Sequence, residues 1–240
     1  MQSIQPIDFE GWKTQEKAKN KAATVNRKMT VIKAALAWAK KNKLIRHNQI
    51  ATLERLTEDD SNVSWRYLSS DERTRLLVAL NGTTRGMYTI VILALNTGIR
   101  RNAIFSLKWN DINFEERNIR LNASSAKSRR VSYIPLNDAA YNALVEWKIL
   151  SPESELVFPS PVTGIKLNNV KRSWKTILRD ADIHNFRFHD LRHDFASRLV
   201  MKGVDLNTVR ELMTHSDIKM TLRYAHLAPE KTKSAVDLLD

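Results

Sequence analysis

The stretch "MYTIVILALN" (Met87–Asn96) is apolar around its whole circumference, and it predicts a helix that is buried on every side. Thr97 and Gly98 follow it, and glycine readily takes the left-handed conformation that commonly ends a helix. Arg100 then opens a further expected helix. A helix buried on every side needs other elements around it, so this stretch predicts the core of a large domain, which we place at residues 63–240.

Three short segments after this helix alternate between apolar and polar residues, as half-buried strands do. They are "DINF" (111–114), "NIRLN" (118–122) and "RVSYIPL" (130–136), with gaps of hairpin length. Helical periodicity resumes from Asn137. The expected fold is therefore mainly α with a small antiparallel β-sheet, an α+β class.

The residues before this domain form a separate helical part. Residues 24–42 carry apolar side chains at helical spacing, with Thr24 as the expected N-cap. The polar segment "TEDDSN" (57–62) contains no apolar residue and predicts a linker. We therefore expect a small helical domain with its linker at residues 1–62.

The composition of the chain indicates which classes of molecule it binds. The chain of 240 residues carries a net charge of +13 with a pI of about 10, which favours polyanions and nucleic acid first. No apolar run reaches the roughly 18 residues of a membrane-spanning helix, and no secretion signal opens the chain. Cysteine is absent, which excludes disulfides and thiolate metal sites and fits a cytoplasmic protein.

A basic stripe marks the predicted helix at residues 170–181. Lys171, Lys175 and Arg179 recur at four-residue steps, a spacing that can follow a phosphate backbone. With Arg27 in the N-terminal helix, they are the candidate DNA-binding residues. An ordinary solvated face remains the alternative for each.

The pentapeptide "HDLRH" (189–193) has the histidine spacing of a zinc-peptidase motif. Asp190, however, is one methylene shorter than the glutamate that such a site uses as its base. No third ligand follows at the expected spacing, and Arg192 would stand beside the dication. We therefore expect no metal centre, and an arginine between histidines favours phosphate binding.

Four segments of the chain, taken together, resemble the successive motifs of the tyrosine recombinases, or phage integrases. They are "TGIRRNAIFSLKWNDI" (97–112), "KSRRVSYIPL" (127–136), "FHDLRHDFASRL" (188–199) and "LMTHSDIKMTLRYAHL" (212–227). Their order and spacing match as well as their residues. The segment "TVNRKMTVIKAALAWAKKNKLI" (24–45) is similar to the second half of the helical core-binding domain of that family, and we expect the first helices of that domain to be missing.

The resemblance implies a site-specific DNA recombinase that cleaves and rejoins strands through a 3′-phosphotyrosine, without metal or other cofactor. It implies a nucleophile, Tyr224, and a general acid, Lys127. The phosphate-binding and proton-transfer groups would be Arg100, His189, Arg192 and His215. Arginines suit this chemistry because they hold a permanent charge and pair with phosphate oxygens.

The resemblance also implies double-stranded DNA as partner. We expect a monomer without DNA and a tetramer on DNA, assembled through the C-terminal segment "PEKTKSAVDLLD" (229–240). Accessory DNA-bending proteins are a further class of partner in this family. The biological role, whether phage integration or another rearrangement, stays open.

Two positions depart from the family pattern. Ala103 stands where an acidic residue usually supports the first arginine, a support that we expect another carboxylate such as Asp194 to replace. Thr214 stands where a glycine usually precedes the histidine, so we expect the turn into His215 to differ. These departures leave open a catalytically impaired remnant that only binds DNA, and the shared chemistry leaves open a type IB topoisomerase. We expect His193 to be a supporting or core residue, less important than His189.

Overall fold

The computed structural model describes residues 5–58, 66–121 and 131–229. The chain divides into two compact units, residues 1–64 and residues 65–240. Each unit is built around its own hydrophobic core.

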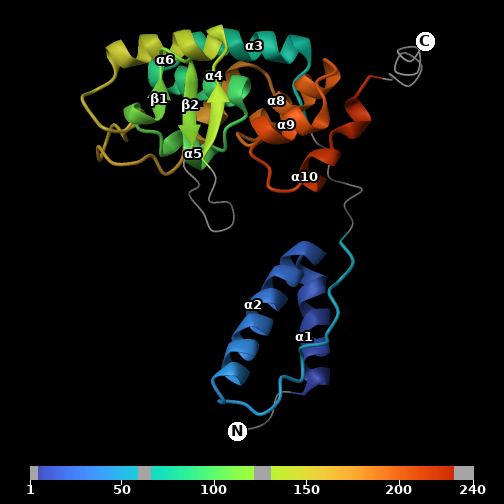
Figure 1. Cartoon of the computed structure of the whole chain (residues 1–240). Helices are drawn as coiled ribbons and strands as arrows, with labels where there is room; N and C mark the ends of the chain where they lie inside the picture. Colours follow the sequence, from blue (N-terminus) through green and yellow to red (C-terminus); the bar gives the residue numbers. More distant parts are fainter. Residues whose placement is uncertain (1–4, 59–65, 122–130, 230–240) are drawn as a thin grey trace, which may run out of the picture. The chain divides into compact units, whose positions relative to one another are not determined.

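The first unit is a pair of helices, α1 (Pro6–Lys19) and α2 (Ala22–Lys41) (Figure 1). Its core contains Phe9, Val25 and Met29 together with Ile50 from the segment after α2. The expected cap at Thr24 is wrong, because α2 already begins at Ala22. The backbone N–H of Thr24 donates to the carbonyl of Lys21, 2.9 Å away, so Thr24 lies inside the first turn.

The second unit is organised around α4 (Arg85–Thr97), which packs against α6 (Asp138–Leu150) on one side and α8 (Asp190–Met201) on another. Thr84 caps α4 at its start, and Gly98 ends it in the left-handed conformation with φ of 62°. The prediction of a buried helix that ends at Gly98 is confirmed. Each large aliphatic side chain that α4 buries contributes roughly 1.5–3 kcal/mol to folding.

Two further helices complete this layer. Helix α3 (Ser70–Asn81) begins with a capping box in which Ser69 and Glu72 satisfy each other's backbone N–H groups. It packs against α7 (Lys171–Asp180), whose Trp174 and Ile177 are buried. The short α5 (Arg101–Phe105) follows α4 directly and has Arg100 as its N-cap.

The small sheet has three antiparallel strands in the order β1 (Ile112–Asn113), β2 (Asn118–Leu121) and β3 (Ser132–Pro135). Ile119 pairs with both Ile112 and Ile134, and these three side chains join the main core. A 3₁₀ turn (Trp109–Asp111) leads into β1. The prediction of a mainly α fold with a small antiparallel sheet is confirmed.

The C-terminal part adds α9 (Leu206–Leu212), α10 (Lys219–Leu222) and a 3₁₀ turn (Ala225–Leu227), shown in orange and red in Figure 1. They form a second small core with α8, made of the buried residues Ala196, Val200, Val209, Met213 and Tyr224. Tyr224 is thus held by packing as well as by the polar contacts described below. Among the described residues, no helix is long and apolar enough to cross a membrane.

Candidate active site

Two turns meet beside the first turn of α8. One follows α4 and contains Gly98, and the other follows α9 and contains Thr214. A side chain at Gly98 would be strained at this positive φ, and its Cβ would collide with the ring of Phe195 and lie 3.0 Å from the sulfur of Met213. Glycine is therefore required where α4 approaches α8 and α9.

Arg192 joins these two turns from the first turn of α8. Its two Nη atoms donate to the carbonyl oxygens of Gly98 and Met213, and the side chain is only 5% exposed. Burial first, and then the charge of Arg100, lower the pKa of Arg192 to about 9. Arg192 therefore remains a cation at neutral pH, and its other N–H groups are left for an anion.

Arg100 makes a third link between the turns. Its Nη1 donates to the Oγ1 of Thr214 at 2.9 Å. Thr214 has φ of 49°, so the turn into His215 takes the left-handed conformation although it carries a β-branched residue. The expectation that Asp194 supports Arg100 is wrong, because the oxygens of Asp194 accept from the backbone N–H of Leu68 and from Arg73.

Tyr224 lies against α8 with its hydroxyl 2.6 Å from Nδ1 of His193. Its residue is 1% exposed, and burial raises the pKa of the phenol to about 12 against the opposing charges of Arg192 and Arg223. The proton is therefore held firmly in the DNA-free protein. The imidazole within reach of this proton belongs to His193, the residue expected from the sequence to be a supporting one.

The other two histidines of the set lie around the same centre. His189 is the N-cap residue of α8, and its ring stands at 89° to that of His193 with the centroids 5.1 Å apart. His215 is buried, and its Nδ1 lies 2.8 Å from the hydroxyl of Thr221. Burial, followed by the charges of Arg192 and Arg100, lowers the pKa of His215 to about 3.

The charge of Arg192 acts on the three histidines and the tyrosine of this group. After burial, it lowers the pKa of His189, and it also contributes to the lowered pKa of His193 and opposes the raised pKa of Tyr224. The structure therefore brings together the described residues that the resemblance marked, which are Arg100, His189, Arg192, His215 and Tyr224. A centre of fixed cations and neutral imidazoles of this kind suits an anion.

Arg223 is a charged neighbour that sequence reasoning missed. Its charge lowers the pKa values of Tyr224, His193 and His215, in each case after the larger effects of burial or of Arg192. Its position next to Tyr224 in "LRYAHL" was a usable signal, since an adjacent cation favours a phenolate.

Five further candidates were predicted from the sequence, and the structure describes four of them. Lys127 lies outside the described residues. Lys171, Lys175 and Arg179 are exposed on α7, where Arg179 also pairs with Asp180 at 2.8 Å, and Arg27 is exposed on α2 of the first unit. In the described ranges, no group of three His, Asp or Glu side chains is arranged to hold a metal ion.

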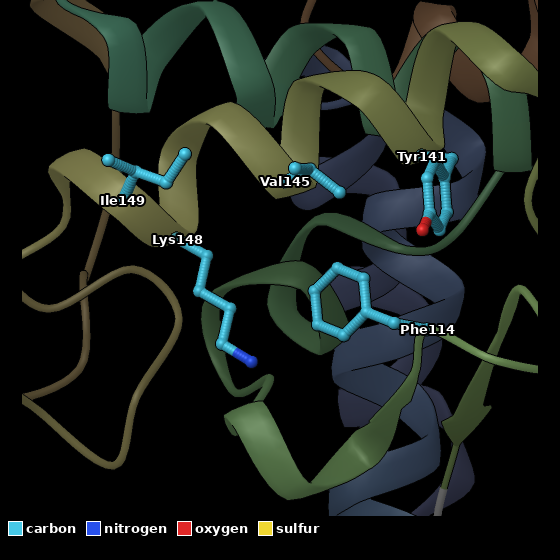
Figure 2. A pocket seen from close by; sticks show the side chains of 5 residues that line it. All are labelled: Phe114, Tyr141, Val145, Lys148 and Ile149. Carbon is cyan, nitrogen blue, oxygen red and sulfur yellow. The ribbon is translucent and has the colours of Figure 1, made fainter.

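A surface pocket of about 420 Å³ lies away from these residues, between α6 and the segment after β1. Figure 2 shows its lining of Phe114, Tyr141, Val145, Lys148 and Ile149, with the Lys148 amine 4.7 Å from the centre of the Phe114 ring. It shares no residue with the arginine and histidine cluster, so we assign the chemistry to that cluster.

The profile of the family described as "Phage integrase family" matches residues 66–231. The chain belongs to the phage integrase family. The resemblance inferred from the four motifs is thus confirmed, and the matched residues include the whole arginine, histidine and tyrosine cluster.

Curated relatives from this family match over only part of their length. The integrase of Salmonella phage P22 is 33% identical over 174 residues, which are 68% of this chain and 44% of the phage protein. A XerC-like tyrosine recombinase of Caldanaerobacter subterraneus is 27% identical over 209 residues, 72% of this chain and 53% of that protein. The chain spans about half the length of the curated relatives it matches.

Solved integrase structures share the fold. The Tn1549 transposon integrase, in complex with a circular intermediate DNA, superposes with a TM-score of 0.77 at 20% identity and covers 100% of this chain and 85% of its own. The catalytic domain of bacteriophage HP1 integrase matches 71% of this chain and 93% of its own with a TM-score of 0.56 at 27% identity. The part of the chain that shares this fold therefore includes the arginine, histidine and tyrosine cluster.

Proposed function

We propose that this protein is a site-specific DNA recombinase that cleaves and rejoins strands through a covalent bond between Tyr224 and a 3′-phosphate. The observation that carries the proposal is the joining of Arg100, Arg192 and Tyr224 around the two turns beside α8. The family membership and the DNA-bound Tn1549 integrase support it.

The arginines supply the electrostatic part of the reaction. A phosphodiester carries one negative charge, and its transition state concentrates charge on the oxygens around phosphorus. Arg192 is held by two carbonyls and Arg100 by Thr214, so both guanidiniums are placed before DNA binds. Donors that need no rearrangement stabilise a transition state most effectively.

The covalent step involves two proton transfers, one from the phenol of Tyr224 and one to the leaving O5′ atom. The phenol oxygen of Tyr224 forms a bond to phosphorus, the phosphorus–O5′ bond breaks, and the O5′ atom takes a proton as it leaves. The phenol proton passes to an imidazole, and His193 is the one within hydrogen-bond reach. A bound phosphate would offset the arginine charges that lower the pKa of this imidazole, which makes it a better acceptor.

The other expected groups complete the proposal. Lys127 is the proposed general acid for the O5′ atom, and His189 and His215 are proposed to contact the phosphate. The first unit is proposed to be a partial core-binding domain that contacts DNA through residues such as Arg27, while α7 contributes its basic stripe. Assembly on DNA into a tetramer through residues 229–240 belongs to the same proposal.

The decisive experiment looks for the covalent intermediate. The purified chain is incubated with nicked duplexes tiled across the DNA that borders its gene, since a nick lets the cleaved fragment leave and traps the adduct. We expect a complex that survives detergent, with the nucleotide on the Tyr224 peptide by mass spectrometry. Tyr224→Phe should abolish it, and Arg192→Ala should slow it about a hundredfold or more. An adduct that persists in Tyr224→Phe would contradict the assignment of the nucleophile.

Further measurements distinguish a recombinase from a protein that only binds DNA and from a topoisomerase. DNA binding with no adduct on any duplex would indicate a remnant that only binds, and relaxation of plasmids without site preference would indicate a topoisomerase. His193→Phe keeps an aromatic ring and removes the nitrogen that contacts Tyr224. We expect it to slow adduct formation at least tenfold, which replaces the expectation that His193 matters much less than His189.

A further inference from the structure

Thr214 occupies a backbone position that suits it poorly. Its φ of 49° is left-handed, and among the non-glycine residues with positive φ in the described ranges it alone is β-branched. The turn itself is complete without its side chain, because the N–H of Thr214 donates to Glu211 and that of His215 to Arg210. Glycine would satisfy the same backbone without strain, so the threonine side chain needs another reason.

The side chain of Thr214 contacts Arg100, and this contact explains why a threonine stands at the strained position. The Oγ1 of Thr214 accepts a hydrogen bond from Nη1 of Arg100 at 2.9 Å, across 114 residues of sequence. Arg100 takes part in no ion pair with any residue that the structure describes. The first turn of its own helix offers Ala103, whose side chain packs towards the core and has no polar atom. The hydroxyl is therefore the side-chain contact that fixes the guanidinium in the described part of the protein.

An unsupported Arg100 would have two reasons to move. An arginine side chain that is not held samples several rotamers. Arg192 lies close enough for the two charges to affect each other, since Arg100 is second to burial in lowering the pKa of Arg192. Because of both effects, the guanidinium would spend less time at the phosphate site. A hydrogen bond to a neutral hydroxyl opposes both effects without neutralising the charge of Arg100.

We propose that Thr214 is a positioning residue for Arg100, and that its hydroxyl does the work of the carboxylate that Ala103 cannot supply. This inference rests on the proposed function, because Arg100 matters through the phosphate that it would hold. The two departures from the family pattern, Ala103 and Thr214, then belong to one arrangement. The left-handed strain at Thr214 is kept because a glycine there would leave Arg100 unsupported.

Three substitutions separate the hydroxyl from the backbone. Thr214→Val keeps the shape and the strain and removes the hydroxyl, Thr214→Gly removes both, and Thr214→Ser keeps the hydroxyl. We expect the first two to slow adduct formation on the nicked duplex about tenfold or more, with Thr214→Ser close to the unsubstituted protein. Thr214→Gly should melt at a higher temperature than Thr214→Val, so that activity follows the hydroxyl and not stability.

Two controls make the test specific. The affinity for the same duplex is measured for each Thr214 variant in the Tyr224→Phe background. If Thr214 only positions Arg100, these affinities stay within about twofold of that of Tyr224→Phe alone. Adding Thr214→Val to Arg100→Ala should cause no further loss of rate, because the group that it positions is gone.

The outcomes are distinct. If the unsubstituted protein forms no adduct, the proposed function fails and this inference fails with it. If the unsubstituted protein forms the adduct and Thr214→Val and Thr214→Gly match its rate, the inference alone is overturned. A loss in Thr214→Ser equal to that in Thr214→Val also overturns it.

Discussion

Two imidazoles of the site, His193 and His215, are buried among arginines. Burial is the largest cause that lowers their pKa values, to about 4 and about 3, and the neighbouring charges of Arg192 and Arg223 add to it. Both rings are therefore neutral in the folded protein at neutral pH. The site holds its cations on arginines, which do not lose their protons, and keeps its imidazoles available to accept one.

This protonation pattern predicts acid sensitivity. An exposed histidine in the unfolded chain takes up its proton near pH 6.5, whereas folded His193 and His215 resist protonation until about pH 4 and below. The unfolded state thus binds more protons in this window, so the free energy of unfolding falls as pH falls from about 6.5 towards 4. Urea unfolding at pH 7.0, 5.5 and 4.5 measures the decline.

Comparison of two variants isolates the histidine contribution. His193→Phe should show a shallower decline with pH than the unsubstituted protein, whereas His47→Gln, at an exposed position, should keep the original slope. The carboxyl of Asp194 works in the opposite direction in all three proteins, because burial raises its pKa. Equal slopes in His193→Phe and His47→Gln would contradict the assignment.

Among the elements, α8 carries both the site and the anchor that holds it. Arg192 faces the two turns and His193 contacts Tyr224, while Asp194 next to them is fully buried and reaches the start of α3. Its Oδ1 accepts from the backbone N–H of Leu68 at 2.9 Å, and its Oδ2 lies 3.4 Å from Arg73. The long-range contact with Leu68 ties the N-terminal edge of this unit to α8.

Removal of this anchor should be costly. Burial raises the pKa of Asp194 more than Leu68 and Arg73 lower it, so the pair contributes little net stability. Without the carboxylate, however, a buried N–H and a partly buried guanidinium lose their acceptor. We expect Asp194→Ala to lower the free energy of unfolding by roughly 2–4 kcal/mol.

Chemical denaturation of Asp194→Ala beside Asp180→Ala measures this effect. Asp180 pairs with Arg179 at the surface, and loss of such a pair changes stability by about 1 kcal/mol or less. If the two variants unfold at the same denaturant concentration, Asp194 is not an anchor.

Local signals predicted the elements well where the deciding atoms are close in sequence. The end of α4 at Gly98 and the alternation of the strands depend on residues within a few positions of one another. The start of α2 was misplaced because a threonine suits both a cap and a first turn. Propensity alone does not choose between these positions.

At the scale of the whole molecule, the effect of the net charge of +13 on DNA binding depends on where the cations lie on the surface. The α7 stripe supplies three exposed cations at four-residue steps, of which Arg179 also pairs with Asp180. Some other exposed cations are paired with carboxylates, such as Arg117 with Asp138 and Lys108 with Glu155. A cation that contacts a phosphate releases condensed counterions from DNA, which makes binding depend on salt.

The stripe therefore predicts a salt dependence. We expect the triple variant Lys171→Ala, Lys175→Ala, Arg179→Ala to reduce the slope of log affinity against log salt by about 2–3. The matched control removes three paired cations, Arg85, Lys108 and Arg117, and should leave the slope nearly unchanged. The two triple variants are compared by measuring the affinity for a labelled duplex at roughly 50 to 300 mM salt, the range in which the effect is measurable. Equal slopes in both triple variants would mean that net charge alone governs binding.

The amino-acid sequence by itself determined the class of fold and the family and predicted the candidate reacting groups, because ordered motifs and helical or strand periodicity are local properties of the chain. Only the tertiary structure decided which of these groups meet. His193 contacts Tyr224 across 31 residues, and Arg100 contacts Thr214 across 114. Such contacts depend on how α4, α8 and α9 pack, and no spacing in the sequence encodes that packing. The contact between His193 and Tyr224 and the contact between Arg100 and the strained Thr214 are therefore visible only in the folded protein.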